Sequence, residues 1–375
     1  MSKRANGEGN IRKRPDGKWE GRYMFEGKRH SVYGKTQAEV RKKLTEAQAQ
    51  IDGGAYIAPS KITVAEWMDK WQADYLRKVK ASTKQRYEID VRLHIKPALG
   101  KELLSKLSPG KITAMYNQEQ DNGLSVKSIK NLHGTLHEAL QQAVKMHYLK
   151  NNPCDDATLP ESDEDKKEMH PFKDKQVKRF LQAIQGNRYE ALFQVALFTG
   201  MRQGEIIGLT WDCVDFSRKS IHLYRQLKRV PKSNGQYRFT TLKNRQERSF
   251  KPPQEVLNIL RAVKRQQAEW RLKCGECWKD TGLVFTDETG GNVNDRTVYN
   301  NFKKIVESIS LPEVRFHDLR HTYATLALQN GIDPKTVSTT LGHATVAFTL
   351  DKYGHVSEAM MQDSADRMQK FIESL

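Results

Sequence analysis

The chain has 375 residues, 37% of them hydrophobic, which is enough for two or three packed domains. It carries 63 Lys and Arg against 45 Asp and Glu, a formal net charge of +18, so its partner is a polyanion or the protein is merely basic. Four scattered cysteines exclude a disulfide framework and fit a reducing bacterial cytoplasm, and no apolar run approaches the roughly 18 residues of a membrane span.

The segment 1–55 is expected to form three short strands and a helix. "RPDGK" and "FEGKR" are turn signals, "KWEGRYMF" between them alternates in character, and a helix follows from about Thr36 to Ile51. Such a ribbon can lie in a DNA groove, or it is a small solvated sheet with a basic face. The candidate DNA-binding residues are Arg12, Lys13, Arg14, Lys18, Trp19, Arg22, Tyr23, Lys28 and Arg29.

Residues 60–155 predict a self-contained helical domain. Segments such as "TVAEWMDKWQADYL" and "SVKSIKNLHGTLHEALQQAVKMHYL" repeat apolar residues at helical spacing, and the stripe that contains Trp67 and Trp71 is typical of a core. The following "NNPCDDATLPESDEDKKEMHPF", rich in proline and charge, predicts an interdomain linker, which we place at 156–170.

The remaining segment, 171–375, predicts a mostly α domain with a small antiparallel β-sheet. Helical patterns dominate it, and one β segment contains the hairpin signal Asn234-Gly235. The whole chain is therefore expected to be multidomain and mainly α, with a small three-stranded sheet plus helix at its N-terminus.

At two places in this last domain, charged or titratable side chains interrupt segments that otherwise look built to be buried. Arg202 opens a short apolar helix after a Thr-Gly break, with Glu205 as its nearest ion-pair candidate. In "VRFHDLRHTYATLAL", His317 and Arg320 stand at i and i+3, and His321 lies near His317 at i+4. An arginine is never a metal ligand, so this second cluster favours an anion over a metal.

Three further polar residues complete the set. His343 directly follows a helix that stops at Gly342, Tyr353 comes ten positions later, and Lys243 lies near the far end of the hairpin. The pair Cys274 and Cys277 is half a zinc site without a second half, so it predicts unligated thiols.

Two arginines, two histidines, a lysine and a tyrosine suit transesterification at a phosphodiester, where the arginines stabilise the developing charge. A tyrosine of pKa ~10 is about one part in a thousand ionised at neutral pH, a deficit of roughly 4 kcal/mol, so it needs a base and cationic neighbours. His317 can supply the base, and a lysine with a lowered pKa can be the acid.

Four motifs carry a family resemblance: "TGMRQGEIIGLTWDCVDF", "HDLRHTYATLAL", "LGHA" and "DKYGHV". In this order and at these separations they resemble the tyrosine recombinase (phage integrase) family, in particular integrases of temperate phages and conjugative transposons. The resemblance spans essentially the whole chain. It implies an arm-type DNA-binding domain at 1–55, a core-site DNA-binding domain at 60–155, and a catalytic domain with a C-terminal docking helix at 171–375.

The resemblance implies how the phosphate is held. Arg202 and Arg320 would clamp the scissile phosphate, His343 would hydrogen-bond to it, and Glu205 would support the site without reacting. His321 receives no chemical role and is interpreted as a supporting or packing residue.

The resemblance also implies the reacting groups. Tyr353 would be the nucleophile, His317 would assist proton transfer at the tyrosine, and Lys243 would protonate the 5′ leaving oxygen. Because the hairpin varies in length within the family, Lys228 and Lys232 are the alternatives to Lys243. No metal and no cofactor are implied.

The activity implied is site-specific DNA recombination through a 3′-phosphotyrosine intermediate and a four-way junction, which integrates and excises a mobile genetic element. The partners implied are double-stranded DNA at core and arm attachment sites, a homotetramer on that DNA, a DNA-bending host protein and an excision factor, in a nucleoid-associated location. The tail would dock on a neighbouring subunit or on its own domain through the helical face Met361, Ala365, Met368, Ile372 and Leu375.

Three alternatives remain from the residues alone. A type IB topoisomerase-like enzyme would share the chemistry but reseal the same strand and relax supercoils. A DNA-binding regulator would lack catalysis, and a metal nuclease would be inhibited by EDTA.

Overall fold

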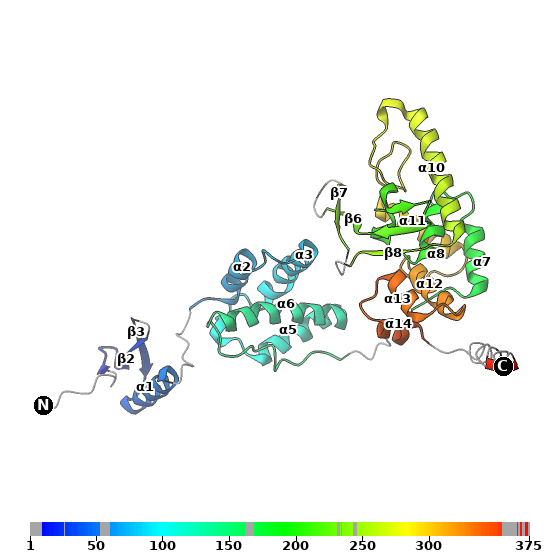
Figure 1. The fold of residues 1–375 in the computed structure, drawn as a ribbon. Helices are drawn as coiled ribbons and strands as arrows, with labels where there is room; N and C mark the ends of the chain where they lie inside the picture. Colours follow the sequence, from blue (N-terminus) through cyan, green and yellow to red (C-terminus); the bar gives the residue numbers. More distant parts are fainter. Residues whose placement is uncertain are drawn as a thin grey trace. The chain divides into compact units, whose positions relative to one another are not determined.

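A computed structural model describes residues 10–25, 27–52, 61–161, 169–230, 233, 235–242, 246–354, 366, 368, 369, 372 and 373 (Figure 1). The chain divides into two compact units, Met1–Asp165 and Lys166–Leu375. The division falls inside the segment 156–170 that the sequence predicts as a linker, although Ala157 and Leu159 still pack against the helical core of the first unit. No helix among the described residues is long and apolar enough to cross a membrane.

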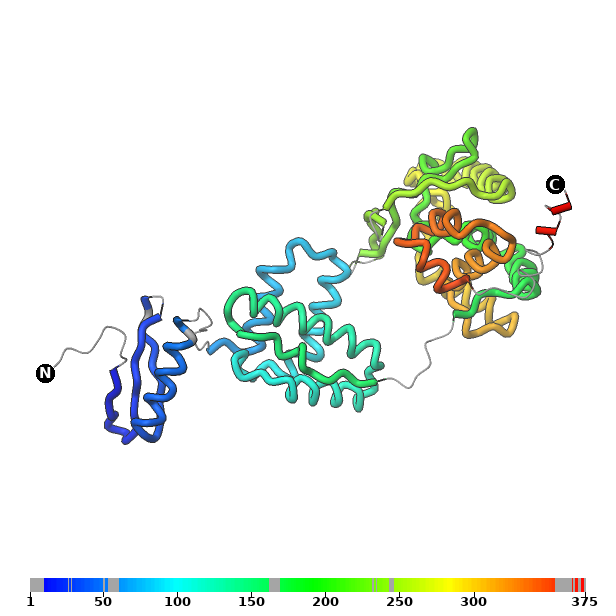
Figure 2. Tube along the Cα trace, turned by 60° about the horizontal axis from the view of Figure 1, so that its bottom comes forward, coloured from blue at the N-terminus to red at the C-terminus, as the bar shows by residue number. Residues whose placement is uncertain are grey.

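The N-terminal segment is a three-stranded antiparallel sheet covered on one face by a helix (Figure 2). Val40, Leu44 and Ala47 of the helix pack against Tyr23 of the central strand, and a Cβ at Gly21 would lie 2.6 Å from Val40, so only glycine allows this close approach. The predicted sheet and helix are confirmed. The elements are β1 (Asn10–Lys13), β2 (Trp19–Phe25), β3 (Lys28–Gly34) and α1 (Gln37–Asp52).

The remainder of the first unit is helical, as the apolar periodicity predicts. Trp67, Met68 and Trp71 are fully or almost fully buried in its core, and the Trp67 indole donates to the carbonyl of Ala139 at 2.9 Å, which ties the first helix to the last. The tryptophan stripe is therefore core. The elements are α2 (Val64–Asp74), α3 (Ala81–Asp90), the π-helix η1 (Val91–Ile95), α4 (Lys96–Leu99), the 3₁₀ turn η2 (Leu104–Lys106), α5 (Pro109–Asp121) and α6 (Val126–Lys145).

The second unit is mostly helical with two small antiparallel sheets, ordered β4-β5-β8 and β6-β7. The predicted hairpin is the β6-β7 pair, in which Arg229 pairs with Tyr237 and Gly235 takes the positive φ of a turn. The strands are β4 (Val214–Asp215), β5 (Ser220–Leu223), β6 (Arg225–Arg229), β7 (Tyr237–Thr241) and β8 (Arg248–Phe250). The helices are α7 (Asp174–Ala183), α8 (Glu190–Thr199), α9 (Gln203–Ile206), the 3₁₀ turns η3 (Trp211–Cys213) and η4 (Gly275–Cys277), α10 (Gln254–Cys274), α11 (Asp295–Ser308), α12 (Asp318–Gln329), α13 (Pro334–Leu341) and α14 (Val346–Tyr353).

Two helices of this unit end in left-handed glycines that other side chains closely approach. A Cβ at Gly200, after α8, would lie 2.5 Å from Leu341, and a Cβ at Gly342, after α13, would lie 3.0 Å from the guanidinium of Arg248. The two helix ends therefore lie close together. Their last carbonyls lack helical partners and carry partial negative charge, so they need donors, preferably cationic ones.

Arg248 of β8 supplies donors and reaches a buried acid at the same time. Its Nε donates to the carbonyl of Thr340 at 2.8 Å, and its two terminal nitrogens donate to the carboxylate of Glu205 at 3.1 and 2.6 Å. Both side chains are at most 5% exposed. Burial alone would raise the pKa of Glu205, but Arg248, together with Arg202, lowers that pKa to about 2, so the carboxylate stays charged.

Removing Arg248 should destabilise the second unit strongly. In Arg248→Met the buried Glu205 loses its bidentate partner and the Thr340 carbonyl loses its donor, so we expect a loss of roughly 3 kcal/mol in the free energy of unfolding. The matched control is Arg271→Met, because the Arg271–Asp280 pair is 3.7 Å long and well exposed. Thermal or urea unfolding of the full chain measures both; equal effects of the two substitutions would contradict the structural role of Arg248.

Candidate active site

Arg320, in the first turn of α12, is the buried centre of the candidate site. Its side chain is 2% exposed, and its guanidinium donates to the carbonyls of Gly200 at 2.9 Å and Leu341 at 2.5 Å. These are the carbonyls at the ends of α8 and α13. Burial and the nearby charge of Arg202 lower the pKa of Arg320 to about 9, which leaves it cationic at neutral pH.

Arg202 lies beside the same pair of helix ends. Its terminal nitrogens donate to Glu205 at 2.8 Å and to the carbonyl of Gly342 at 3.3 Å, and its own backbone N–H donates to Glu205 at 3.0 Å. In Arg202 and in Arg320 alike, the contacts with protein oxygens use two of the about five N–H donors of the guanidinium, which leaves donors for a further oxygen. The sequence predicted the Arg202–Glu205 pair, but Arg248, the second partner of Glu205, carried no recognisable sequence signal.

Tyr353 ends α14 and is 7% exposed. The ring of His343 stacks on the tyrosine ring with a centroid distance of 6.1 Å, and His343 Nδ1 is hydrogen-bonded to Thr349 at 2.8 Å. His343 is thus fixed between α13 and α14, and the residues that the sequence singled out in these two segments do lie together.

The tyrosine hydroxyl contacts a histidine to which the sequence gave no role. His321 Nδ1 lies 2.6 Å from Tyr353 Oη, and the ring of His317 meets His321 edge to face with centroids 4.9 Å apart. His321 is therefore more than a packing residue. Its only sequence signal was the helical spacing from His317, which places both histidines on one face of α12 but does not say which of them reaches the tyrosine.

The electrostatics of the site are those of a cationic site without its anion. Burial and the neighbouring Arg320 and Arg202 lower the pKa of His343 to about 3. Partial desolvation of the His317 ring against the protein, with His321 and Arg320 nearby, lowers the pKa of His317 to about 4, although the residue as a whole is exposed at the surface. Burial raises the pKa of Tyr353, and Arg320 opposes this rise. At neutral pH both histidines are neutral and the tyrosine keeps its proton, and a bound anion would shift the histidine pKa values upward.

The lysine of the predicted site is not placed: Lys243 lies outside the described residues, as does its alternative Lys232. Lys228 is described and is exposed on β6, where it pairs with Arg238. Among the described residues there is no group of three or more His, Cys, Asp and Glu arranged to hold a metal ion. Cys274 is partly exposed and Cys277 is exposed, and both are free thiols.

The register of the N-terminal sheet places the candidate DNA-binding residues on two different faces. Tyr23 is 7% exposed and Trp19 packs on the same core, so both aromatic side chains serve the contact with α1. Arg12 and Arg22 lie on the opposite face, where both donate to Glu20, at 2.6 and 3.1 Å; the hydrogen bonds from Arg22 and Arg12 lower the pKa of Glu20 to about 2. Lys13, Arg14, Lys18 and Arg29 are exposed, and the side chain of Lys28 is not described.

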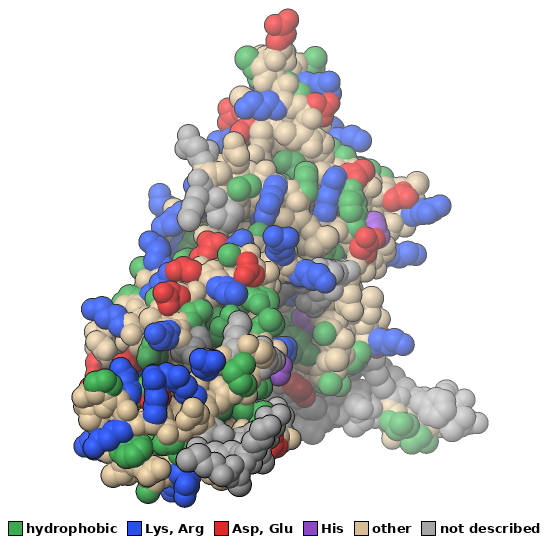
Figure 3. Space-filling view, turned by 90° about the vertical axis from the view of Figure 1, so that its left-hand side faces the viewer, with side chains coloured by type: hydrophobic (Ala, Val, Ile, Leu, Met, Phe, Trp, Pro, Cys, Tyr) green, Lys and Arg blue, Asp and Glu red, His purple; other side chains and the backbone are tan. Residues whose placement is uncertain are grey.

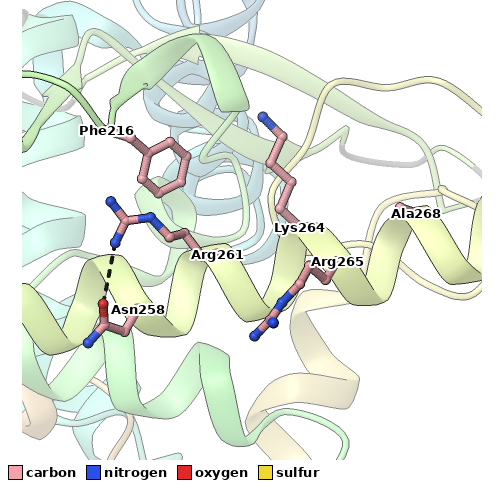
Figure 4. Close-up of a pocket in the computed structure, with 6 residues that line it drawn as sticks. All are labelled: Phe216, Asn258, Arg261, Lys264, Arg265 and Ala268. Carbon is pink, nitrogen blue, oxygen red and sulfur yellow. Dashed lines mark hydrogen bonds between the residues drawn. The ribbon is translucent and has the colours of Figure 1, made fainter.

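Cationic side chains are spread over the surface well beyond these positions, as Figure 3 shows for one face. One open hollow lies along α10, where Arg261 and Lys264 lie beside Phe216 and Arg265 points away from that ring (Figure 4). Arg261 lies 5.1 Å above the Phe216 ring. The residues that line this hollow include no nucleophile and no acid–base pair.

Comparison with known proteins agrees with the geometry. Residues 171–360 match the Phage integrase family, and residues 63–119 match the N-terminal SAM-like domain of phage integrases. The protein "Tyrosine recombinase XerC-like" of Caldanaerobacter subterraneus subsp. tengcongensis is 32% identical over 344 residues, which cover 88% of each chain.

Two solved structures share the fold. The Tn1549 transposon integrase, in complex with transposon right end DNA, superposes with a TM-score of 0.70 at 23% identity, over 82% of this chain and 100% of that one. A lambda integrase tetramer bound to a Holliday junction superposes with a TM-score of 0.59 at 16% identity, over 95% of this chain and 99% of that one. Motifs, fold and relatives agree: the chain belongs to the phage integrase family of tyrosine recombinases, enzymes that cleave and rejoin DNA strands.

Proposed function

We propose that Tyr353 attacks a DNA phosphodiester held by Arg202 and Arg320, which forms a 3′-phosphotyrosine link and releases a 5′ hydroxyl. One observation carries the proposal: both guanidinium groups, the His343 ring and the tyrosine lie around the same two helix ends. An anionic oxygen placed there would meet two cations already fixed in position, so little reorganisation is needed as charge develops in the transition state.

The supporting residues follow from the same contacts. Glu205 and Arg248 hold Arg202 from behind, while carbonyls hold Arg320, so both arginines are braced from the protein side. His343 would donate to a non-bridging oxygen, and His317, exposed at the start of α12, is assigned by the family resemblance to assist proton transfer at the tyrosine. We keep Lys243 as the proposed acid for the 5′ oxygen, with Lys228 and Lys232 as alternatives.

The covalent link keeps the energy of the broken bond, so the 5′ hydroxyl of a partner strand can reseal it. We propose that the protein recombines core and arm attachment sites of a mobile element, of phage or conjugative-transposon type, in both the integrating and excising directions. A homotetramer would act on two DNA duplexes through a four-way junction, helped by a DNA-bending host protein and an excision factor, at the nucleoid in the cytoplasm. Supercoil relaxation without recombinant products would instead favour the topoisomerase-like alternative.

The N-terminal sheet offers a face for the arm sites. Strand register places Arg12, Arg22 and Arg29 on the face that α1 leaves uncovered, together with Tyr33 and Met24, which are 46% and 57% exposed. Exposed and partly exposed cations with apolar neighbours suit contacts to phosphates and base edges in a DNA groove. We propose this face as the arm-DNA surface; Trp19 and Tyr23 would act only through the core.

The covalent intermediate is the first test. The full chain, incubated with a core-site duplex nicked next to the cut, should form a protein–DNA adduct that resists denaturation, and Tyr353→Phe should form none because it lacks the attacking oxygen. Adding EDTA should change nothing, since no metal takes part. An undiminished adduct with Tyr353→Phe would refute the assigned nucleophile.

Arg202→Lys tests the shape of the clamp separately from its charge. Lysine keeps the positive charge but cannot contact Glu205, the Gly342 carbonyl and a phosphate at once, so cleavage should fall by at least about 100-fold. Affinity for the duplex should stay within about threefold. Gel-shift and single-turnover assays on the same substrate check both; near-normal cleavage would mean that the fork is not needed.

The arm surface predicts a difference between two nearby cations. Arg29→Ala, on the uncovered face, should weaken binding to DNA from the ends of the element and reduce the slope of log affinity against log salt by about 0.9. Lys13→Ala is the control, because its register partner Trp19 lies on the α1 side. Removal of 1–55 should abolish arm binding but leave core-site cleavage. Equal effects of the two alanines would argue against the assigned face.

The C-terminal tail is proposed to dock on a neighbouring subunit. Most of its predicted apolar face lies outside the described residues, Met361, Ala365 and Leu375 included, whereas Met368 and Ile372 are described and are 59% and 56% exposed. Replacing both with serine, or truncating the chain after Val356, should abolish recombination and spare DNA binding. Gln369→Ser with Glu373→Ser is the matched control. A truncated protein that recombined normally would exclude docking between subunits.

A further inference from the structure

The closest polar contact of Tyr353 is with a histidine other than the one that the family resemblance assigns as its base. Among the described residues, the side chain that hydrogen-bonds to the Tyr353 hydroxyl is His321, at 2.6 Å. The His343 ring lies nearly parallel to the tyrosine ring, with 10° between their planes, and its Nδ1 contacts Thr349. His317 contacts His321 through its ring edge.

We propose that His321, rather than His317, takes the proton of Tyr353 when the strand is cut and returns it when the strand is resealed. This inference rests on the proposed function, because it concerns the same nucleophile. His317, on the exposed side of the pair, would then contact the phosphate and pack edge to face against the His321 ring.

The geometry sets the tautomer that the proposal needs. Since Nδ1 of His321 faces the phenol, this nitrogen must be the acceptor, so the ring proton sits on Nε2. Nε2 lies 3.9 Å from a carboxylate oxygen of Asp318, which favours that tautomer and stabilises the imidazolium formed by the transfer. A negative group behind the ring is what a histidine base requires.

Asp318 is itself held firmly in place. It is fully buried, and it accepts hydrogen bonds from the backbone N–H of Arg315 at 2.8 Å and from the Arg315 guanidinium at 3.1 and 2.9 Å. Arg315, Asp318, His321 and Tyr353 thus form a connected row from the surface to the nucleophile. The row is built from Arg315 just before α12, the first turn of α12 and the end of α14, all of which lie in the described part of the chain.

The step balances without a co-reactant other than the acid already proposed. The proton moves from Tyr353 Oη to His321 Nδ1, the bond between Oη and phosphorus forms, and the bond from phosphorus to the 5′ oxygen breaks. The 5′ oxygen takes a proton from Lys243, or from the lysine that replaces it in this role. Resealing reverses each transfer, and nothing is oxidised or reduced.

His321 is in the right protonation state for this role. Burial lowers its pKa below the ordinary histidine value, Asp318 opposes the shift, and the ring is neutral at physiological pH. Cleavage should therefore fall as the pH drops through this lowered pKa, because a protonated ring cannot accept. Among the described residues, several titratable and charged groups lie around the His321 ring. At and before the start of α12 they are Arg315, His317, Asp318 and Arg320; from α14 they are Lys352 and Tyr353; and His343 follows α13.

The sharpest variant is His321→Asn, because an asparagine oxygen can stand near the position of Nδ1 and accept a hydrogen bond but cannot take a proton. With the nicked duplex, adduct formation by the full chain should fall at least about 100-fold and lose its acidic limb. His222→Asn is the control: this histidine is exposed on β5 and bonds to Ser249. His321→Ala should regain part of its rate when imidazole is added, which a structural role would not produce.

A substrate with sulfur in place of the bridging 5′ oxygen separates base from acid. The thiolate leaves without a proton, so Lys243→Ala should recover on this substrate while His321→Asn should not. A His321→Asn enzyme within about threefold of wild type across the pH range, or one rescued by the sulfur substrate, would overturn the proposal. If His321→Asn is normal while Tyr353→Phe forms no adduct, only the base is wrong; an adduct with Tyr353→Phe means that the proposed function itself has failed.

Discussion

The buried guanidinium of Arg320 is the interaction on which the rest of the site depends. It satisfies the end of α8 through Gly200 and the end of α13 through Leu341, two segments more than a hundred residues apart in sequence. A residue that bonds two helix ends cannot move without exposing buried carbonyls, each of which would cost about 1–3 kcal/mol. The fold therefore holds the proposed phosphate-binding group, Arg320, by the same contacts that close its core.

More positive than negative charge is gathered around Arg320. Arg202, Arg248 and Arg320 lie near one carboxylate, Glu205, and the neighbouring histidines respond with lowered pKa values. Such repulsion is tolerated because carbonyl dipoles at two helix ends face the cations. If a DNA phosphate binds here as proposed, it would relieve this repulsion, and DNA binding would then stabilise the second unit.

The sequence predicted most of the fold because its signals are local. Turn residues and helical periodicity defined the N-terminal sheet and the helical unit, and the motifs around Arg202, Arg320 and Tyr353 named residues that the fold brings together. Arg248 escaped prediction because its partner, Glu205, lies 43 positions away and the pairing exists only after β8 and α9 pack together. Tyr23, a sequence candidate for DNA contact, packs against α1, because alternation along a strand does not say which face a helix will cover.

Sequence spacing could not distinguish His317, just before α12, from His321 within it. His317 and His321 share a helical face, and both were equally near any site on that face as judged from spacing. What separates them is the direction from which α14 approaches: it brings the Tyr353 hydroxyl to His321 Nδ1 and leaves His317 exposed. Asp318 then lies behind the histidine that contacts the Tyr353 hydroxyl, and a carboxylate oxygen of Asp318 is 3.9 Å from Nε2 of that histidine. A histidine base needs one ring nitrogen free to accept the proton and a negative group near its other nitrogen. In this arrangement His321 has both.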